Sequence, residues 1–448
     1  MNRAVMSACR IGTTAALFVC GISIAWGDTG TAGSDGPVTT KGISTTFVPI
    51  LEARKAIQSG TTLAAKRSVV NVSTSSPTAQ VTSTEDFGGA STLPLWTFDA
   101  YSSRDGRKHH GAMVGTSPFS NPGTARVPTK VIPVVLKIHS IGTGIDANGN
   151  ITTVPGNVTV NPNSADNTCF AAPNNVPTKL FLQSPLIQPA PFSIGPTYVG
   201  TTQYVDAFMR GNFYNALGHK LDSYHLLLDP VNTLDAVVID VPAVQGLAIT
   251  DPNFFGSPPI CTPFVIIDIN WFDDYLNDRL LNDMQDQGVN PTTLPVFFLY
   301  NTVMSAPANS LGNCCVLGYH SYGGFPTPAQ TYSVGDFDSS GAFGPGTENT
   351  DVLAHELDEW ANDPYGINLV PPWGGVGQVS GCQANLEVGD PLSGTNFPPV
   401  TMPNGFTYNL QELAFFSWFL GAPSIAVNGW YSDNNTFTTD AGTPCTYQ

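Results

Sequence analysis

The segment at residues 351–364 holds the residue types of this sequence that are best suited to catalysis. It reads Asp-Val-Leu-Ala-His-Glu-Leu-Asp-Glu-Trp-Ala-Asn-Asp-Pro and contains His355, Glu356 and Glu359. In a helix, His355 and Glu359 lie on one face, one turn apart, so that both can bind one metal ion. Glu356 lies next to that face, where its carboxylate can act as a general base toward a metal-bound water. The spacing therefore predicts a metal centre on a helix.

The residues around this motif predict a short helix with one buried stripe. Asn349 or Thr350 can cap its N-terminus. Asp363-Pro364 ends it, because proline disfavours helical geometry in the preceding residue. The apolar residues that follow helical spacing are Leu353, Leu357 and Trp360. The alternative is a solvated helix whose His and Glu face water, but four of the seven glutamates of the chain lie between residues 348 and 387, which that alternative does not explain.

This helix resembles the active-site helix of zincin metallopeptidases, with glutamate in place of the second histidine of H-E-x-x-H. The longer pattern is similar to that of a group of largely uncharacterised secreted bacterial proteins, and plant exordium (phosphate-induced) proteins share a related pattern. The matching pieces are His355-Glu-Leu-Asp-Glu359, Asp363-Pro364, Glu387-Val-Gly-Asp390 and Cys315-Val-Leu-Gly-Tyr-His320. The resemblance covers residues 310–395 and implies a metallopeptidase.

The resemblance also implies where a third ligand lies. A catalytic zinc site uses three protein ligands and an open position, and in gluzincin-like sites the third ligand follows the helix by some tens of residues. Glu387 is the first choice for this ligand and Asp390 the second, although Asp390 can instead orient His355. The metzincin pattern does not apply, because Asn362 and Tyr365 stand at the positions of its glycine and third ligand.

His320, which lies between Tyr319 and Tyr322, is a second candidate for catalysis. Its imidazole can polarise a substrate carbonyl or stabilise the oxyanion that forms there. Two carboxylates and one imidazole neutralise a divalent cation and weaken its Lewis acidity. We therefore expect Zn²⁺ as the cofactor, with Ca²⁺ or Mn²⁺ as alternatives and a purely structural ion left open.

Three functions are compatible with these residues. The first, which we favour, is a secreted metal-dependent hydrolase, a peptidase with a polypeptide substrate, in which Glu356 activates a metal-bound water. The second is a non-catalytic extracellular or cell-wall binding protein that holds a structural ion. The third is a metal-free acid hydrolase that uses a carboxylate pair such as Glu356 and Glu387. An unengaged Glu356 that faces a cleft would favour the first function, and a paired or solvated Glu356 the second.

The surrounding segments predict a mixed α/β domain. Apolar and β-branched runs predict strands at residues 130–139, 234–241, 262–269, 294–300 and 330–337. Helical spacing predicts helices at residues 204–217, 271–287 and 410–420. The expected fold class is α+β: one large, loop-rich, disulfide-bonded metallohydrolase domain at residues 87–448 with a zincin-like helix in it.

The composition excludes two classes of protein. The chain has 448 residues, with 17 Lys and Arg against 34 Asp and Glu and a net charge of -17. The basic residues form no cluster, so we expect no nucleic-acid partner. The 25 Phe, 14 Tyr and 7 Trp are far more than a disordered chain carries. A folded, loop-rich protein is therefore expected.

The N-terminal region predicts export. Residues 1–27 read as a secretory signal peptide, since two arginines precede the apolar stretch at residues 11–25 and small residues stand at its end. Residues 28–86 are rich in Ser, Thr and Gly, and we expect a flexible pro-segment or linker with a short helix at residues 47–57. We therefore expect a secreted protein, extracellular or periplasmic, without a membrane anchor once the signal is removed.

Six cysteines follow the predicted signal peptide, and an even number in an exported chain predicts disulfides. They are Cys169, Cys261, Cys314, Cys315, Cys382 and Cys445. Spacing does not choose among the possible pairings, but we expect Cys314 and Cys315 to have different partners, because a bridge between neighbours strains the peptide unit. A cysteine metal site is not expected, since no C-x-x-C spacing occurs.

Overall fold

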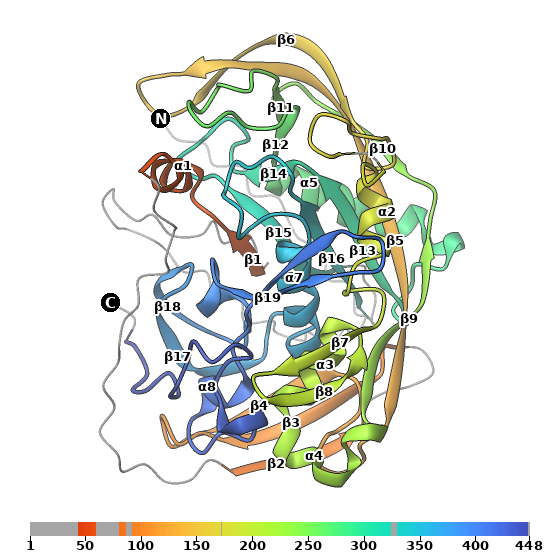
Figure 1. Cartoon of the computed structure of the whole chain (residues 1–448), viewed down its shortest axis with the longest axis vertical. Helices are drawn as coiled ribbons and strands as arrows, with labels where there is room; N and C mark the ends of the chain where they lie inside the picture. The colour runs from red at the N-terminus through yellow and green to blue at the C-terminus, as the bar shows by residue number, and fades with distance from the viewer. Residues whose placement is uncertain (1–43, 60–79, 87–91, 172, 324–328, 447–448) are drawn as a thin grey trace, which may run out of the picture. The chain divides into compact units, whose positions relative to one another are not determined.

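The longest strand, β5 (Thr124–Ile145), organises the main sheet (Figure 1). Its 22 residues are rich in Val, Ile and Thr, which favour extended backbone, and they include the strand predicted at residues 130–139. It pairs in parallel with β9 (His225–Thr233), β10 (Val237–Val241), β11 (Gly246–Ile249) and β13 (Leu294–Tyr300), and antiparallel with β6 (Ile151–Val160). β5 can pair with all five strands because it is longer than each of them, so that they pair with different stretches of it.

Seven strands of this sheet form a closed ring. In order they are β15 (Val316–Gly323), β14 (Thr302–Ser305), β12 (Phe264–Asp268), β11, β5, β13 and β16 (Gln330–Phe337), and β16 pairs again with β15. The computed structural model describes residues 44–59, 80–86, 92–171, 173–323 and 329–446, and it is 39% strand and 21% helix. The expected α+β, zincin-like fold is therefore wrong: the protein is mainly β, around a seven-stranded barrel.

The strands that the sequence did not reveal explain this error. β6 and β8 (Thr197–Thr202) are rich in Thr, and β6 exposes most of its side chains, so no apolar run marks it. Main-chain hydrogen bonds to neighbouring strands hold these segments instead, β6 on β5 and β8 on β7 (Ala190–Ile194). Periodicity therefore underestimates the strand content of this chain.

The helix expected at residues 410–420 is also wrong. Thr407–Gln411 forms strand β20, which pairs with β19 (Asn396–Thr401), and only Phe416–Leu420 is helical, as α8. The apolar character is correct, since Leu410, Leu413 and Phe419 are fully buried. At the start of this segment the backbone N–H and C=O groups form hydrogen bonds with strand β19 and not with a helical turn.

The remaining strands lie in smaller sheets or at the edge of the main sheet. β2 (Gln80–Asp86), β3 (Leu95–Tyr101) and β4 (Lys108–Val114) form one sheet, β17 (Leu369–Val376) and β18 (Val379–Asn385) a second, and β1 (Ser44–Phe47) extends the main sheet beyond β15. The strands expected at 294–300 and 330–337 are confirmed as β13 and β16. Those expected at 234–241 and 262–269 correspond to the shorter β10 and β12.

The helices are short. They are α1 (Ile50–Ser59), α2 (Pro177–Leu182), α3 (Tyr204–Asn212), α4 (Tyr214–Leu217), α5 (Ile269–Tyr275), α6 (Leu281–Asp283), α7 (Asp351–Asn362) and α8, and a π-helical turn at Leu276–Leu280 joins α5 to α6. Single 3₁₀ turns lie at Gly218–Ser223, Gln285–Gln287, Asp390–Leu392 and Val427–Gly429. The helices expected at residues 204–217 and 271–287 are thus confirmed, each as a series of shorter helical segments.

Helix α7 is the predicted motif helix, and all 12 of its residues are buried. It contacts β15, β16, β20 and α3 (Figure 1). Gly318 on β15 permits the close approach, because a Cβ atom there would lie 2.7 Å from Val352 Cγ1 and 2.9 Å from Glu356 Cγ. The protein therefore encloses the charged side chains of this helix.

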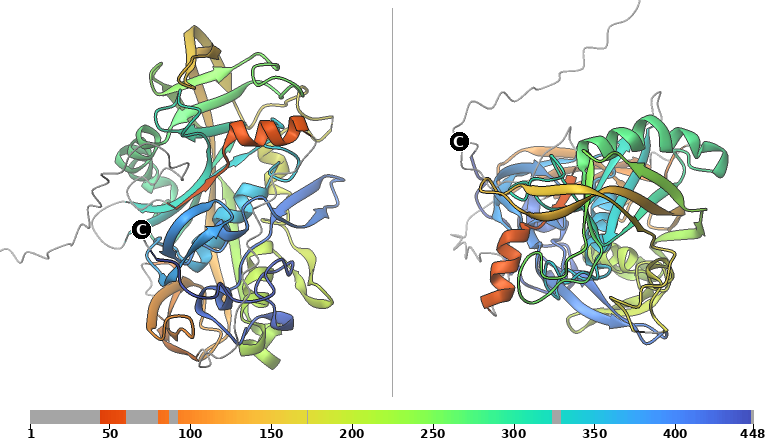
Figure 2. Two further views of the ribbon diagram at one scale, coloured as in Figure 1. Left: turned by 90° about the vertical axis from the view of Figure 1, so that its left-hand side faces the viewer. Right: turned by 90° about the horizontal axis from the view of Figure 1, so that it is seen from above.

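The N-terminal region contributes to the body of the protein. Within residues 28–86 the structure describes β1, α1 and β2, and the signal peptide predicted at residues 1–27 lies outside the described residues. β1 pairs antiparallel with β15, and α1 follows it across the main sheet (Figure 2). Ile50 and Ala53 of α1 are fully buried in the same apolar cluster as Leu317 of β15. The helix expected at residues 47–57 is present, starting three residues later.

Three disulfides join Cys169 to Cys261, Cys314 to Cys315 and Cys382 to Cys445. The expectation that Cys314 and Cys315 have different partners is wrong: the two are bridged to each other across a cis peptide bond, with their Cα atoms 3.0 Å apart. Three disulfides are compatible with an extracellular protein. None of the described helices has the length and apolar composition that a membrane crossing requires.

Removal of the Cys169–Cys261 bridge should destabilise the protein. The bridge joins residues 92 positions apart, and closing a loop of that length lowers the entropy of the unfolded chain by an amount worth about 4 kcal/mol. We expect the double variant Cys169→Ala/Cys261→Ala to lose about this much free energy of unfolding in chemical denaturation. The control is Cys314→Ala/Cys315→Ala, which removes a bridge that closes no loop. Equal losses in the two variants would contradict the prediction.

Candidate metal centre

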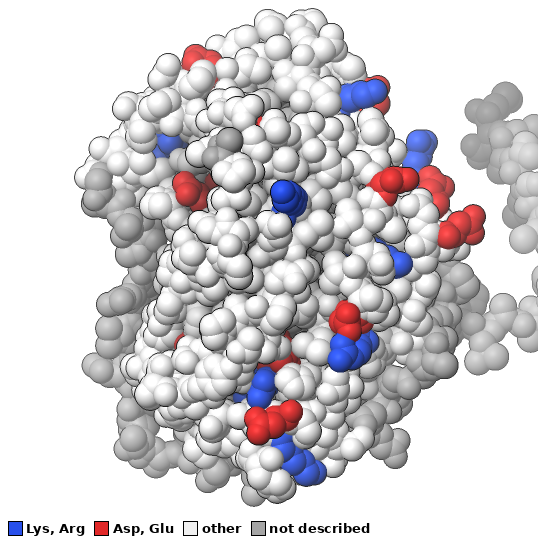
Figure 3. Space-filling model, turned by 45° about the vertical axis from the view of Figure 1, so that its right-hand side comes forward, with Lys and Arg blue, Asp and Glu red and all other residues white. Residues whose placement is uncertain are grey.

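The ionisable groups that the sequence singled out lie inside the protein. The face in Figure 3 is mostly uncharged, with scattered acidic and basic side chains. By contrast, exposed fractions of at most 4% are found for His320, His355, Glu356, Glu359, Glu387 and Asp390. A buried charge costs free energy unless another charge or hydrogen bonds compensate it. The partners of these six residues therefore determine what the site can do.

Three segments bring the six residues together. His320 lies on β15, where its backbone pairs with Ser333 of β16. Helix α7 contributes His355, Glu356 and Glu359, and the loop after β18 contributes Glu387 and Asp390. The structure thus gathers every residue that the sequence analysis named for the site, including His320 from far upstream.

The imidazole of His355 is oriented by a glutamine. Nδ1 donates a hydrogen bond to Gln411 Oε1 at 2.9 Å, and Gln411 Nε2 donates to the carbonyl oxygen of Gly389 at 2.6 Å. Nε2 makes no hydrogen bond among the described residues, although Glu359 Oε1 lies 3.0 Å away and Asp390 Oδ1 3.5 Å away. A buried nitrogen lone pair that faces two carboxylates requires a cation between them, either a proton or a metal ion.

Main-chain amides of the downstream loop hold Glu359. Its Oε1 accepts hydrogen bonds from the N–H groups of Gly389 (3.0 Å) and Asp390 (3.1 Å). Burial raises the pKa of Glu359, but the charge of His355 and these hydrogen bonds lower it more, so that its pKa lies below the usual 4.5. Glu359 is therefore ionised, as a metal ligand must be.

Gly389 explains why glycine occurs in the Glu387-Val-Gly-Asp390 segment. A Cβ atom at this position would lie 2.5 Å from Nδ1 and 2.6 Å from Cγ of His355. Only glycine lets the loop approach the ring closely enough to donate its amides to Glu359. The segment thus supplies two carboxylates, two amide donors and the space for an imidazole.

His320 is oriented by the residue that ends α7. Its Nε2 donates to the carbonyl oxygen of Asp363 at 3.1 Å, which leaves Nδ1 facing Glu356 Oε2 at 3.3 Å and Glu359 Oε2 at 3.7 Å. Glu387 Oε2 lies 3.9 Å from Nε2. The Asp363-Pro364 step therefore both stops the helix and aims a second histidine at its carboxylates.

Two overlapping groups of three residues place ligand atoms within 4.8 Å of one another. They are His320, Glu359 and Glu387, and His355, Glu356 and Glu359. Glu359 belongs to both, so it is the residue on which any metal site here depends. The ligand set named from the sequence, His355 and Glu359 with Glu387 or Asp390, stays a prediction. The structure adds His320 as a candidate ligand, where the sequence suggested a catalytic role for it.

The electrostatics of the cluster favour a bound cation. Burial lowers the pKa of His355, but Glu359, Asp390 and Glu356 raise it more, and its pKa lies well above the usual 6.5. Burial, and then the charge of Glu359, raises the pKa of Asp390 to about 7. The carboxylates attract the protonated form of His355, and repulsion from Glu359 adds to the effect of burial on Asp390. A divalent cation relieves the same repulsion without protons.

Glu356 is engaged by a residue of the N-terminal strand. Its Oε1 accepts a hydrogen bond from the N–H of Thr46 at 3.1 Å and a second from Thr46 Oγ1. Its Oε2 faces His320. Burial raises the pKa of Glu356 above its usual value. The carboxylate expected to act as a general base is therefore covered and paired in this form of the protein.

Strand β1 is held on both of its edges at this point. On one edge Thr46 stands opposite Gly318 of β15 in an antiparallel pair. On the other edge the side chain of Gln378 accepts a hydrogen bond from the N–H of Phe47 at 2.8 Å and donates one to the carbonyl oxygen of Thr45. An extended stretch of main chain thus lies across Glu356 between a strand and a glutamine.

Sequence reasoning missed Thr46, Gln378 and Gln411. Gln411 stood in the segment expected to be a core helix, and its polar side chain at the start of an apolar run was the available signal. Gln378 lies between β17 and β18, and Thr46 lies in a region read as a pro-segment or linker. No local pattern distinguishes either of them from ordinary polar residues.

Comparisons with protein-family models, with curated proteins and with solved structures found no match to this chain.

Replacement of Gly389 by alanine should weaken metal binding. The added Cβ would displace the His355 ring, which lies 2.5 Å from its position, and loss of ligand orientation typically costs about 10- to 100-fold in metal affinity. The control is Gly381→Ala, because a Cβ at Gly381 would have no atom within 4 Å. Isothermal titration with Zn²⁺ measures both variants. Equal affinities would contradict the assignment of His355 to the metal.

Proposed function

We propose that this protein is a secreted metal-dependent hydrolase whose substrate is a polypeptide. The observation that supports a metal is His355, whose buried Nε2 faces two carboxylates without a hydrogen bond. His355 and Glu359 would hold the ion, with Glu387, Asp390 or His320 as further ligands. Imidazole and carboxylate are the ligand types of catalytic zinc sites, so Zn²⁺ is the ion we propose.

The residues of the site have separate roles in this proposal. A divalent cation bound here supplies Lewis acidity, which polarises a carbonyl group and makes water easier to deprotonate. Glu356 accepts the proton of the attacking water and returns it to the leaving nitrogen. Burial raises its pKa above the usual 4.5, and a raised pKa makes a carboxylate better suited to accept a proton and return it. His320, when it is protonated, would position the carboxylate of Glu356 by donating a hydrogen bond from Nδ1.

The N-terminal strand supports a polypeptide substrate. β1 is itself a peptide that crosses Glu356, with its main chain bonded to β15 and to Gln378. Addition of a strand to a sheet edge is a common way to bind extended peptides. In this proposal β1 occupies the place of the substrate, and the protein is latent until residues 44–59 leave.

A structural ion is the second candidate function. The observation in its favour is that Glu356 is fully buried and bonded to Thr46, which is the arrangement expected of a non-catalytic extracellular protein. The two functions differ in what happens once β1 is removed. The metal-free acid hydrolase differs from both in predicting insensitivity to chelators.

Substitution of Glu359 should abolish metal binding. Glu359 belongs to both candidate ligand groups, so Glu359→Gln removes a charged ligand from either one. We expect about one equivalent of zinc per chain in the purified mature protein, as in a single zinc site, and none in the variant. The control is Glu348→Gln, which lies just before α7 and outside both groups. Elemental analysis measures all three proteins, and a wild type without metal would refute the proposal.

Removal of the N-terminal segment should activate the enzyme. We would insert a specific protease site between residues 60 and 79, cut the mature protein, and separate the N-terminal piece. Casein hydrolysis is expected only after cutting, because Glu356 is then uncovered. The same cut protein with Glu356→Gln should keep its metal and stay inactive. A cut protein that keeps its metal and its fold but cleaves nothing would favour the structural ion.

A further inference from the structure

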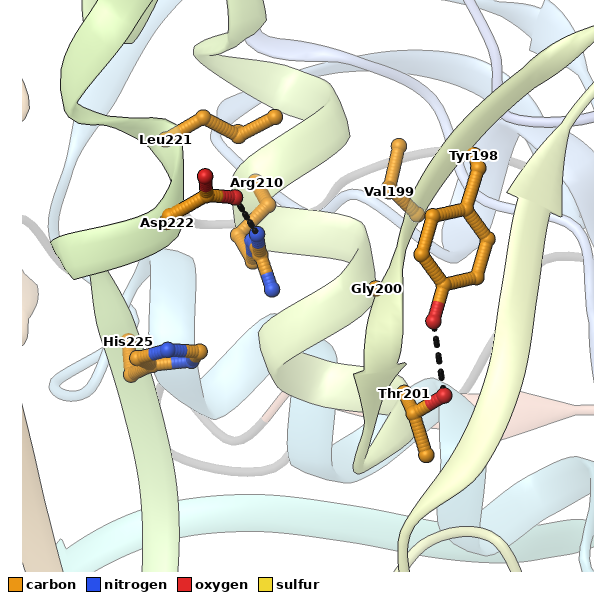
Figure 4. Close-up of a pocket in the computed structure, with 8 residues that line it drawn as sticks. All are labelled: Tyr198, Val199, Gly200, Thr201, Arg210, Leu221, Asp222 and His225. Carbon is orange, nitrogen blue, oxygen red and sulfur yellow. Dashed lines mark hydrogen bonds and ion pairs between the residues drawn. The ribbon is translucent and has the colours of Figure 1, made fainter.

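A pocket that shares no residue with the metal cluster lies between the β7–β8 hairpin, α3 and the start of β9 (Figure 4). Its cavity has a volume of about 240 Å³, which is small compared with pockets for drug-sized ligands, of about 300–1,000 Å³. The residues that matter for its chemistry are Tyr198, Gly200, Thr201, Arg210, Asp222 and His225. Arg210 is the only one of these six that carries a permanent positive charge.

Within the part of the chain that the structure describes, the buried guanidinium group of Arg210 has no hydrogen-bond acceptor. Arg210 is 5% exposed, and its Nε has no hydrogen-bond partner among the described residues. Its nearest carboxylate oxygens are Asp206 Oδ2, 4.0 Å from one terminal nitrogen, and Asp222 Oδ1, 3.7 Å from the other. Both distances exceed a hydrogen bond. A buried arginine in this state carries donors that the protein leaves unsatisfied.

Neither carboxylate compensates Arg210 well. Asp206 already accepts other hydrogen bonds, among them one of 2.6 Å from Thr202 Oγ1 and one of 2.8 Å involving His225 Nδ1. The side chain of Asp222 is fully exposed, so that water solvates its charge. Arg210 therefore has two ion-pair partners, at 4.0 and 3.7 Å, but donates a hydrogen bond to neither, so that a ligand in the pocket can still accept one from it.

The guanidinium group of Arg210 lines the pocket beside Gly200. Gly200 has φ +142°, and a Cβ atom there would lie 2.3 Å from a terminal nitrogen of Arg210, so that only glycine leaves room for the guanidinium group at this point of the wall. Figure 4 shows the guanidinium group between Asp222 and Gly200. The hydroxyl groups of Tyr198 and Thr201, 2.7 Å apart, lie on the Gly200 side and can donate hydrogen bonds.

We infer that this pocket binds a carboxylate group, which pairs with Arg210. The planar fork of a guanidinium group matches the two oxygens of a carboxylate, and such bidentate pairs are among the strongest hydrogen-bonded contacts in proteins. The small cavity fits a short organic acid or the free C-terminal residue of a peptide. The inference is independent of the metal centre and of any hydrolytic activity.

The test is binding of two carboxylates to the full mature protein. Acetate and a tripeptide with a free C-terminus are titrated and followed by NMR chemical shifts, and the same tripeptide with an amidated C-terminus is the ligand control. We expect the acid forms to bind and the amide not to bind. Binding of both acids indicates a chain terminus, and binding of acetate alone indicates a free small acid. Absence of binding by either acid, or equal binding of the amide, would overturn the inference.

Two matched variants test whether Arg210 is the residue that binds the carboxylate. Arg210→Lys keeps the charge but loses the bidentate fork, and we expect binding to weaken at least about tenfold. Arg126→Lys is the control, because Arg126 is an exposed arginine that pairs with Asp229 outside the pocket. Thermal unfolding checks that both variants are folded. Equal binding by the two variants would also overturn the inference.

Discussion

The burial of helix α7 is the constraint on which this structure depends. A helix of 12 residues that is buried along its whole length carries His355 and four acidic residues, namely Asp351, Glu356, Asp358 and Glu359. Every such charge must be neutralised or compensated where water is excluded. Asp358 shows one solution: neither of its oxygens has a hydrogen-bond partner among the described residues, and burial raises its pKa well above the usual value, which favours the neutral form. His355, Glu356 and Glu359 show the other solution, in which surrounding elements provide partners and leave room for a cation.

The scaffold around α7 differs from the one that its motif suggests. The chemistry of the motif needs only the local geometry of a helix, in which side chains four residues apart share a face. That geometry is available in any fold, and here the helix lies against a barrel. Glycines at the contact make this possible: a Cβ at Gly335 of β16 would lie 2.5 Å from Leu353 Cδ2, as Gly318 and Gly389 would meet other α7 side chains. The backbone of the sheet and of the loop can therefore approach the helix closely.

The buried carboxylates of the metal cluster and the buried Arg210 differ in how the protein compensates their charges. The carboxylates of the metal cluster receive amides, hydroxyls and imidazoles from four separate segments, including β1 at the N-terminal end of the described chain. Arg210 lines a pocket and has two ion-pair partners, but it donates no hydrogen bond to any described residue. The difference is physically reasonable, since a metal ion needs a preorganised set of ligands, whereas a carboxylate ligand brings its own two oxygens to one guanidinium group.

The sequence by itself determined the local features: helix α7 with its ends, strands β13 and β16, and the set of His and Glu residues that could bind a metal. These depend on contacts between residues a few positions apart, which spacing and residue type encode directly. The closure of the barrel, the pairing of Cys314 with Cys315, and the roles of Gln378 and Gln411 were decided only by the tertiary structure. Thr46 and Glu356 are 310 positions apart in the chain, and no periodicity relates them. Their hydrogen bond exists because the register of β1 on β15 sets Thr46 against the one face of α7 that carries the carboxylates.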